Sequence, residues 1–188
     1  MYKEKLEPIL DDLENKDIEI AGGSVVGMNL AIINSLIKYI SNLTIGKKKY
    51  EDVQDEVKSI LLEAKILKTD SLHVIDQDKV VLEKILDAYK KRKENEEQYQ
   101  FVCRESVEFC MKVLNIAFST LKLSNRISKV GNKMLSSDFK ISKYYAFASV
   151  KSAIVNVEIN LDSLKNEKYK EEIKEKYNNI LEEARRLL

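Results

Sequence analysis

The chain has 188 residues, with 32 basic and 31 acidic side chains, a formal net charge of +1 and 44% hydrophobic residues. This size and balance describe one domain over 1–188. A charge near zero argues against nucleic-acid or membrane binding, because phosphate backbones and anionic lipids favour a clear basic excess. Five glycines and one proline are too few for many strands joined by tight turns.

The first expected helix spans 2–14, where apolar residues fall on one face. The most apolar stretch, 25–43, contains three asparagines and one lysine. We expect a helix buried in the protein there and no membrane span. Ser24 is its expected N-cap, and Gly46 is expected to close it. The chain begins without an apolar core behind a basic segment, so we expect a cytoplasmic protein.

The remaining elements also follow a helical pattern. Residues 50–90 contain neither glycine nor proline, which predicts one very long helix or two nearly collinear helices. A polar turn at 90–97 precedes a third apolar pattern at 99–123. A loop over 131–138, a helix through 144–161 and a terminal helix from about Glu167 complete the chain. The sequence therefore predicts an all-α antiparallel bundle of about six helices.

Two of the predicted helices are more apolar than the surface of a monomer allows. Self-association is the simplest way to cover the surplus apolar surface, so we expect a homodimer. A monomeric mass in analytical ultracentrifugation at micromolar concentration would contradict this expectation.

The two cysteines, Cys103 and Cys110, lie seven residues apart in an apolar stretch. This spacing fits neither a zinc site nor a disulfide framework. We expect two reduced core residues and no metal site.

The most informative pattern is a row of positions along the long helix that steps by alternate fours and threes and should face the core. Its members are Val53, Val57, Ile60, Ala64, Leu67, Ser71, Val74, Asp78, Val81, Ile85 and Ala88. A buried Asp78 should have a raised pKa, gather hydrogen-bond donors or line a ligand cleft. Each outcome suits a general acid or base, whereas a purely structural acid bonded to a neighbouring helix is equally compatible.

Two other polar features allow either a structural or a functional interpretation. Gly22-Gly23-Ser24 is able to bind an anion at a helix N-terminus, although helices also begin this way without a ligand. Asn156 and Asn160, four residues apart, are able to bind a polar heterocycle, or to bond to each other and to nearby backbone.

The second acid near Asp78 is Asp76. It lies roughly 200° around the helix from Asp78, so the two do not form a side-by-side pair. His73 is three residues before Asp76, which favours a surface pair between them.

Several segments occur together in one order: Gly22-Gly23-Ser24-Val25, residues 42–53, Asp76-Gln77-Asp78, Gly131-Asn132 with Ser137-Asp138, and residues 156–161. In this combination the chain resembles the cyclodeaminase/cyclohydrolase family of folate metabolism. That family comprises the C-terminal half of formiminotransferase-cyclodeaminase and free-standing bacterial relatives. The resemblance implies an all-helical dimer with a folate cleft between helices. It implies a tetrahydrofolate derivative as substrate, with no metal or other cofactor.

The resemblance also assigns roles to residues. It places the proposed catalytic aspartate on Asp78, the second acid of the Asp-x-Asp motif. It implies a substrate site formed by Gly22, Gly23, Ser24, Lys47, Asp76, Asn132, Ser137, Asp138, Asn156 and Asn160. In this reading the glycine turn meets carboxylates or a carbonyl, the amides hold the pterin, and Lys47 pairs with the glutamate tail.

The implied activity is cyclodeamination of formiminotetrahydrofolate, hydrolysis of methenyltetrahydrofolate, or both, with Asp78 as general acid and base. The chain departs from the family at three places: residues 90–92 replace its Lys-Leu-Pro turn, and two further changes fall where the substrate should lie. Residues 20–24 replace Pro-Gly-Gly-Gly-Ser, and residues 79–82 replace Ala-Glu-Ala-Phe. These departures leave open an alternative, a catalytically silent helical dimer that binds folate or a protein.

Overall fold

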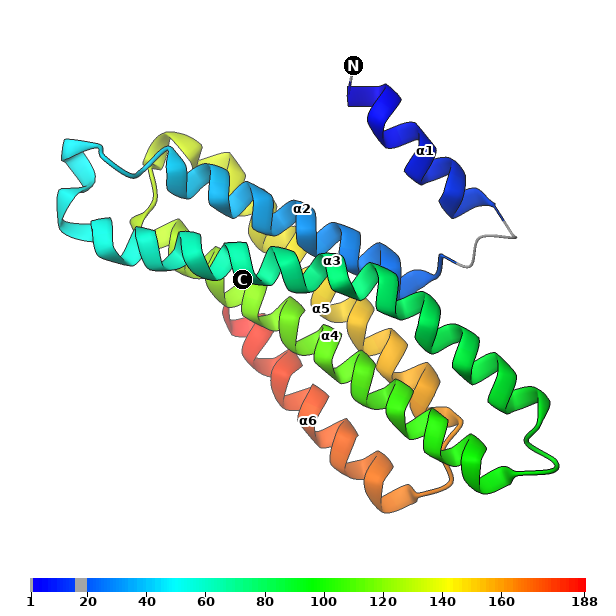
Figure 1. Ribbon diagram of the computed structural model, residues 1–188. Coiled ribbons are helices and arrows are strands. Elements are labelled where there is room, and N and C mark those ends of the chain that lie inside the picture. The colour runs from blue at the N-terminus through cyan, green and yellow to red at the C-terminus, as the bar shows by residue number, and fades with distance from the viewer. Residues whose placement is uncertain (1, 16–19) are drawn as a thin grey trace.

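The structure is a computed structural model that describes residues 2–15 and 20–188. Within these residues every regular element is a helix (Figure 1). The elements are α1 (Tyr2–Glu14), α2 (Gly22–Asn42), the 3₁₀ helix η1 (Lys48–Val53), α3 (Gln54–Lys90), α4 (Glu96–Val130), the 3₁₀ helix η2 (Lys133–Leu135), α5 (Ser136–Asp162) and α6 (Glu167–Arg186). The prediction of an all-α fold of about six helices is confirmed.

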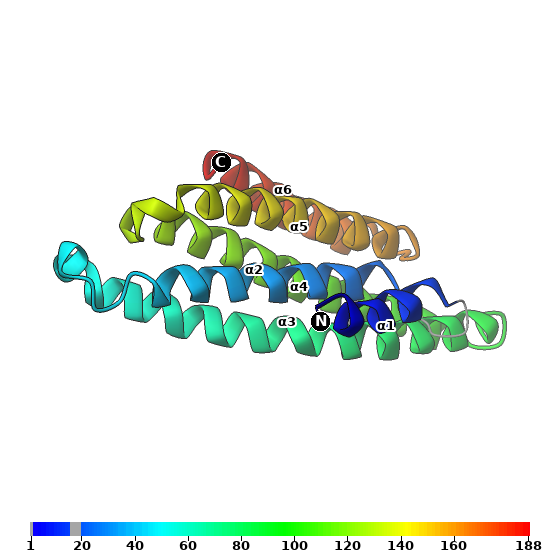
Figure 2. The ribbon, with the colours of Figure 1, turned by 90° about the horizontal axis from the view of Figure 1, so that it is seen from above.

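Four helices, α2 to α5, form an antiparallel bundle, and α6 packs on α4 and α5. Apolar side chains from all four helices form the core; Leu30, Ile60, Leu114 and Val150 are fully buried. Helix α1 stands apart in Figure 1 and has no buried residue. Seen from above in Figure 2, α2 lies between α3 and α5. The beginning of α2 is therefore bordered by two other helices.

Helix α2 is long and apolar enough to cross a membrane by length and composition alone. In the structure it is a core helix, and 56% of its most apolar window is buried inside the protein. The fully buried Asn34 donates from Nδ2 to Thr120 Oγ1 on α4 at 3.0 Å. Such a polar contact across the core fits packing against another helix.

The helix boundaries follow local chemistry, with one correction. The side chains of Asn95 and Asn166 accept hydrogen bonds from backbone N–H groups three residues ahead and cap α4 and α6. The predicted loop over 131–138 is wrong, because α5 already begins at Ser136. Small polar residues and the acidic Asp138 suit a first helical turn as well as a loop.

Helices α2 and α3 approach each other closely at Gly27. A Cβ atom at Gly27 would lie only 2.9 Å from the backbone oxygen of Ser71 and 3.1 Å from the side chain of Val74. The distance to the Ser71 oxygen is shorter than real Cβ contacts, and that atom belongs to the backbone, so a larger residue at Gly27 would push the two helices apart. The close approach fixes how the first turn of α2 meets α3.

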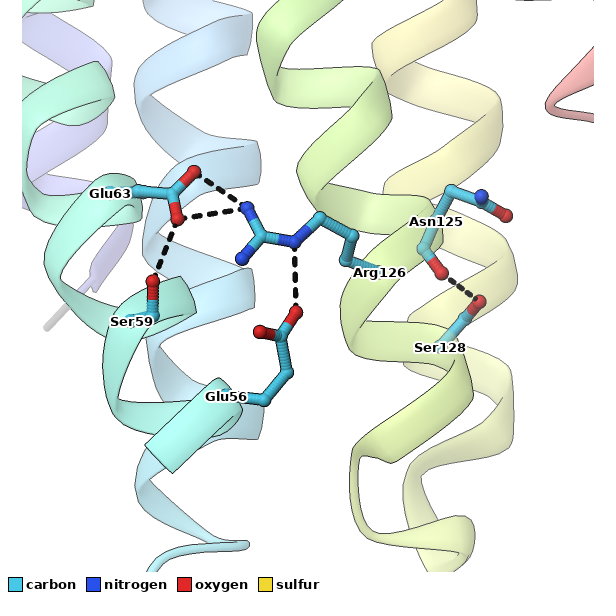
Figure 3. Close-up of polar contacts among 6 residues, drawn as sticks. All are labelled: Glu56, Ser59, Glu63, Asn125, Arg126 and Ser128. Atoms are coloured by element: carbon cyan, nitrogen blue, oxygen red, sulfur yellow. Dashed lines mark hydrogen bonds and ion pairs between the residues drawn. The ribbon is translucent and has the colours of Figure 1, made fainter. Parts of the chain in front are cut away.

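At the other end of α3, an arginine of α4 clamps two acids (Figure 3). Arg126 donates from Nε to Glu56 Oε1 at 2.9 Å and from Nη1 to Glu63 Oε2 at 2.7 Å. Burial raises the pKa of Glu63, but hydrogen bonds from Arg126 and Ser59 outweigh this effect and hold it below its ordinary value. The side chains remain 36% to 44% exposed, so solvent screens the interaction.

We predict that Arg126→Met destabilises the protein by about 1 kcal/mol at pH 7, the upper range for an exposed network. Because the pKa of Glu63 is lowered in the folded state, its contribution is present above the unfolded value and is lost as the pH falls through the folded value. Urea denaturation should therefore show the two proteins converging as the pH drops below 4. A difference that persists at pH 3 would assign the effect to packing of the arginine methylenes.

Candidate active site

Asp78 lies on α3 directly beside the first turn of α2. The predicted core-facing row of α3 is buried only in its first part, where Val57, Ile60, Ala64, Ser71 and Val74 are covered. Asp78 is half-buried, so the expectation of a buried acid is wrong. The reason is geometric: α2 begins at Gly22, and α3 continues for three more turns past this point with less cover.

The carboxylate of Asp78 is bound by Ser24. Oδ2 accepts a hydrogen bond from the backbone N–H of Ser24 at 2.8 Å and one from its hydroxyl at 3.0 Å. Ser24 was the expected N-cap, but the helix already begins at Gly22 with Ala21 as its cap. Asp78, on α3, therefore accepts a hydrogen bond from a backbone N–H of the first turn of α2, which has no partner within its own helix. The carboxylate also lies at the positive end of the α2 dipole.

Gly23 makes room for this arrangement. A Cβ atom at Gly23 would lie 2.0 Å from Oδ1 and 2.6 Å from Cγ of Asp78. Any larger residue would displace the carboxylate or push the helices apart. At Gly22, by contrast, the nearest atom to an added Cβ is Asn156 Oδ1 at 3.7 Å, an ordinary contact. The glycine turn thus has a specific steric function at its second position.

Helix α5 brings two amides to the same place. Asn156 lies beside Gly22, and Asn160 follows one turn later. The amide of Asn160 is bonded internally: Nδ2 donates to the backbone oxygen of Asn156 at 2.8 Å, and Oδ1 accepts from Ser106 Oγ at 2.9 Å. Of the two alternatives predicted for this pair, Asn160 follows the structural one: its side chain bonds to nearby groups of the protein. The side chain of Asn156 borders the glycine turn at Gly22.

Helix α4 adds two residues that the sequence analysis did not assign to the site. Ser106 bonds to Asn160, and Nδ2 of Asn160 donates to Cys110 Sγ at 3.5 Å. Burial, and to a smaller degree the charge of Asp78, raises the pKa of the Cys110 thiol to about 12. Both cysteines are free and buried, as predicted. Their spacing indicated a core position but gave no sign that one of them adjoins Asp78.

The two oxygens of the Asp78 carboxylate have different surroundings. Among the described residues, Oδ2 receives both hydrogen bonds from Ser24, while Oδ1 receives none. These two hydrogen bonds fix the orientation of the carboxylate. Oδ1 lies against Gly23, where it is the atom nearest to an added Cβ. Of the three outcomes expected for Asp78, the structure shows hydrogen-bond donors around its carboxylate, both from Ser24.

The other predicted substrate-binding residues lie elsewhere. Lys47, Asn132, Ser137 and Asp138 are at the opposite end of α2, roughly 30 Å away for a helix of 21 residues. Asn132 is buried there, where its backbone N–H donates to Thr44 Oγ1 at 3.0 Å. Asp76 is exposed on the outer side of α3. One chain by itself does not bring the full predicted set together.

A hollow of about 700 Å³ opens between α3, α4 and α6, away from Asp78. Its walls include Arg104, which pairs with Glu108 at 3.2 Å and stacks over the ring of Tyr169. None of the predicted site residues lines this hollow. We therefore place the candidate site at Asp78, because of the chemistry of the residues around it. The volume of the hollow is not by itself a reason to place the site there.

A metal site is a separate question. The residues that the structure describes include no group of three or more His, Cys, Asp or Glu side chains placed to hold a metal ion. The polar atoms around Asp78 come from hydroxyl, amide and thiol groups instead.

Comparison with known proteins bears on this site. The sequence profile described as Formiminotransferase-cyclodeaminase matches residues 5–179. A methenyltetrahydrofolate cyclohydrolase of Methylorubrum extorquens is 25% identical, over 96% of this chain and 90% of the relative. The crystal structure of formiminotetrahydrofolate cyclodeaminase from Thermotoga maritima has 25% identity and a TM-score of 0.86, over 97% of this chain and 88% of that one.

The profile match covers nearly the whole chain, and the structural match covers the bundle that carries Asp78. The glycine turn, the acid on α3 and the amides on α5 all lie within the matched residues. The chain therefore belongs to the formiminotransferase-cyclodeaminase family.

Proposed function

We propose that this protein is a one-carbon enzyme that converts the formimino or methenyl group of tetrahydrofolate, with Asp78 as the general acid and base. The two relatives named above carry out cyclohydrolysis and cyclodeamination, and both align with this chain over most of its length. The observation that carries the proposal is the Asp78 carboxylate, held through Oδ2 by the backbone N–H and the hydroxyl of Ser24 at the N-terminus of α2.

A single carboxylate suits cyclohydrolysis. Water adds to the cationic methenyl carbon, and its proton passes to Asp78. The bond from this carbon to N5 then breaks as the new hydroxyl group loses its proton to solvent. N5 takes up the proton held by Asp78, which leaves a formyl group on N10 and one proton released overall. Asp78 is a carboxylate at the start and a carboxylate at the end, so one group serves both proton transfers.

The same group suits cyclodeamination. With the formimino group protonated at the start, N10 attacks its carbon and loses a proton. The former formimino nitrogen, now an amine, takes up one proton and leaves as ammonia, and the methenyl cation remains. Asp78 takes the first proton and delivers the second. The two reactions act on one carbon between the same two nitrogens, so they need the acid at the same place.

The neighbouring amide gives the site a way to orient the pterin. Asn156 has a donor and an acceptor on its side chain and borders Gly22, the neighbour in sequence of the Gly23 that contacts Asp78. Asn160 and Ser106 hold the turn of α5 that carries it. A pterin ring presents alternating donors and acceptors along one edge, which a carboxamide can match.

We expect Asp78→Asn to lower turnover by about 10²–10⁴-fold, because the amide cannot take a proton. The assay is loss of methenyltetrahydrofolate absorbance, corrected for spontaneous hydrolysis, together with ammonia release from formiminotetrahydrofolate. Asp87→Asn, an exposed position on the same helix, is the matched control and should retain activity. Folate binding by the native protein without turnover in either assay would favour the catalytically silent alternative.

We expect Gly23→Ala to lose activity and about 1–3 kcal/mol of stability, because the added methyl group collides with the Asp78 carboxylate. Gly22→Ala adds a methyl group of the same size with room for it, so its thermal midpoint should stay near that of the native protein. Equal stability of the two variants would show that Asp78 moves away at little cost.

We expect Asn156→Leu to weaken binding of a non-hydrolysed folate by about 3–10-fold, the effect of one or two neutral hydrogen bonds. Isothermal titration calorimetry measures this dissociation constant directly. Asn115→Leu, at an exposed position on α4, serves as the control. An unchanged constant for the Asn156 variant would remove this residue from the site.

A further inference from the structure

The hydroxyl of Ser24 lies between two acceptors on α3. Its Oγ is 3.0 Å from Oδ2 of Asp78 and 3.1 Å from the backbone oxygen of Ile75. A hydroxyl group carries a single hydrogen, so it donates to one of these oxygens at a time. Because the two distances are nearly equal, a rotation about the Cβ–Oγ bond is enough to exchange one acceptor for the other.

Burial limits the hydroxyl to these two partners. Ser24 is only 1% exposed, so bulk water does not reach it. A buried hydroxyl without an acceptor costs free energy, which keeps its hydrogen on one of the two oxygens. The backbone oxygen of Ile75 has two lone pairs, so it can accept the hydroxyl and still accept the hydrogen bond of its own helix.

The charge of Asp78 decides which acceptor is preferred. Hydrogen bonds to an ionised group are roughly twice as strong as neutral ones, so the carboxylate attracts the hydroxyl hydrogen more strongly than the Ile75 carbonyl does. A protonated carboxyl group loses this advantage. A proton held on Oδ2 also needs an acceptor of its own, and the lone pair of Ser24 Oγ is the nearest one.

We propose that Ser24 is a positioning residue whose hydroxyl exchanges its acceptor when Asp78 changes its protonation state. When Asp78 is ionised, the hydroxyl donates to Oδ2. When Asp78 is protonated, the hydroxyl donates to the backbone oxygen of Ile75, and Oγ accepts from the carboxyl group. This inference rests on the proposed function, in which Asp78 takes up and releases a proton in every turnover.

The exchange suits a residue that acts both as base and as acid. A donor that always points at a carboxylate favours the ionised form and so opposes proton uptake. The backbone N–H of Ser24, 2.8 Å from Oδ2, is a donor of this fixed kind. The hydroxyl has a partner in either state, so it holds the Asp78 side chain in place during both proton transfers.

The titratable groups packed around Asp78 do not compete with it. On α4, the Cys110 thiol stays neutral near pH 7, because burial, and to a smaller degree the charge of Asp78, raises its pKa to about 12. On α2, Lys38 is the one charged residue and lies 14 positions after Ser24, roughly 21 Å along the helix. The residues one turn from Asp78 on α3 are apolar: Val74, Ile75, Val81 and Leu82. The nearest charged residues of α5 are exposed: Lys151 and Glu158.

The first test follows the Ile75 carbonyl carbon by carbon-13 NMR. A hydrogen bond to a carbonyl oxygen moves the resonance of its carbon downfield. As the pH is lowered, the Ile75 resonance should move downfield with the same midpoint as the Asp78 carboxyl carbon. Most of this response should be lost in Ser24→Ala. The Leu67 carbonyl, which accepts the Ser71 hydroxyl at 2.6 Å on the same helix, is the matched control and should not follow Asp78.

Asp78→Asn gives the same comparison at neutral pH, where acid unfolding plays no part. The amide carries no charge, so the Ser24 hydroxyl should donate to Ile75 throughout. The Ile75 resonance should therefore lie downfield of its native position at pH 7, and a second substitution, Ser24→Ala, should move it back. An Ile75 resonance that ignores both the Asp78 titration and Asp78→Asn would overturn the proposal.

The second test is kinetic. Ser24→Ala should lower kcat by about 10–100-fold, the effect of one hydrogen bond to a charged group, and change KM by less than about 3-fold. Ser71→Ala removes another buried hydroxyl of this region, one that donates to helix backbone, and should retain the native kcat. A rise in KM with kcat unchanged would make Ser24 a substrate-binding residue and contradict the positioning role.

The two tests separate this inference from the proposed reaction. The NMR measurements need no turnover, so an inactive native protein in which Ile75 still follows Asp78 would contradict the proposed function and support the exchange. An active protein in which Ile75 does not follow Asp78 would support the proposed function and overturn the exchange.

Discussion

The close approach of α2 to α3 is the constraint on which the site depends. Gly23 and Gly27 lie one turn apart on the side of α2 that faces α3, and a side chain at either position would meet atoms of α3 at 2.9 Å or less. This separation puts the first-turn N–H of Ser24 within 2.8 Å of the Asp78 carboxylate. The helix N-terminus and the acid therefore form one unit, which neither helix provides alone.

Much of the fold was predictable from the sequence because it rests on local signals. The absence of glycine and proline over 50–90 predicted the long helix, and the polar segment at 90–97 predicted its end. The error at 131–138 arose because Ser136, Ser137 and Asp138 suit both a loop and a helical start. The segment is helical because the next residue, Phe139, is buried and ties it to the core.

The candidate site was predictable in part. The spacing of the α3 row identified Asp78 as an acid on the core-facing side, and the structure gives it two donors. The degree of burial of Asp78 was not predictable. The spacing of the row indicates which side of the helix faces the core, but it does not indicate how far a neighbouring helix covers that side. The position of Cys110 near Asp78 depends on the packing of α4 against α3, which no spacing within α4 encodes.

The uneven cover of α3 has a consequence for motion. All fully buried residues of this helix lie between Val57 and Val74, and the Arg126 clamp adds polar contacts to that half. The half after Asp78 has fewer packed contacts, so its backbone amides can exchange with solvent through local opening while the first half stays closed.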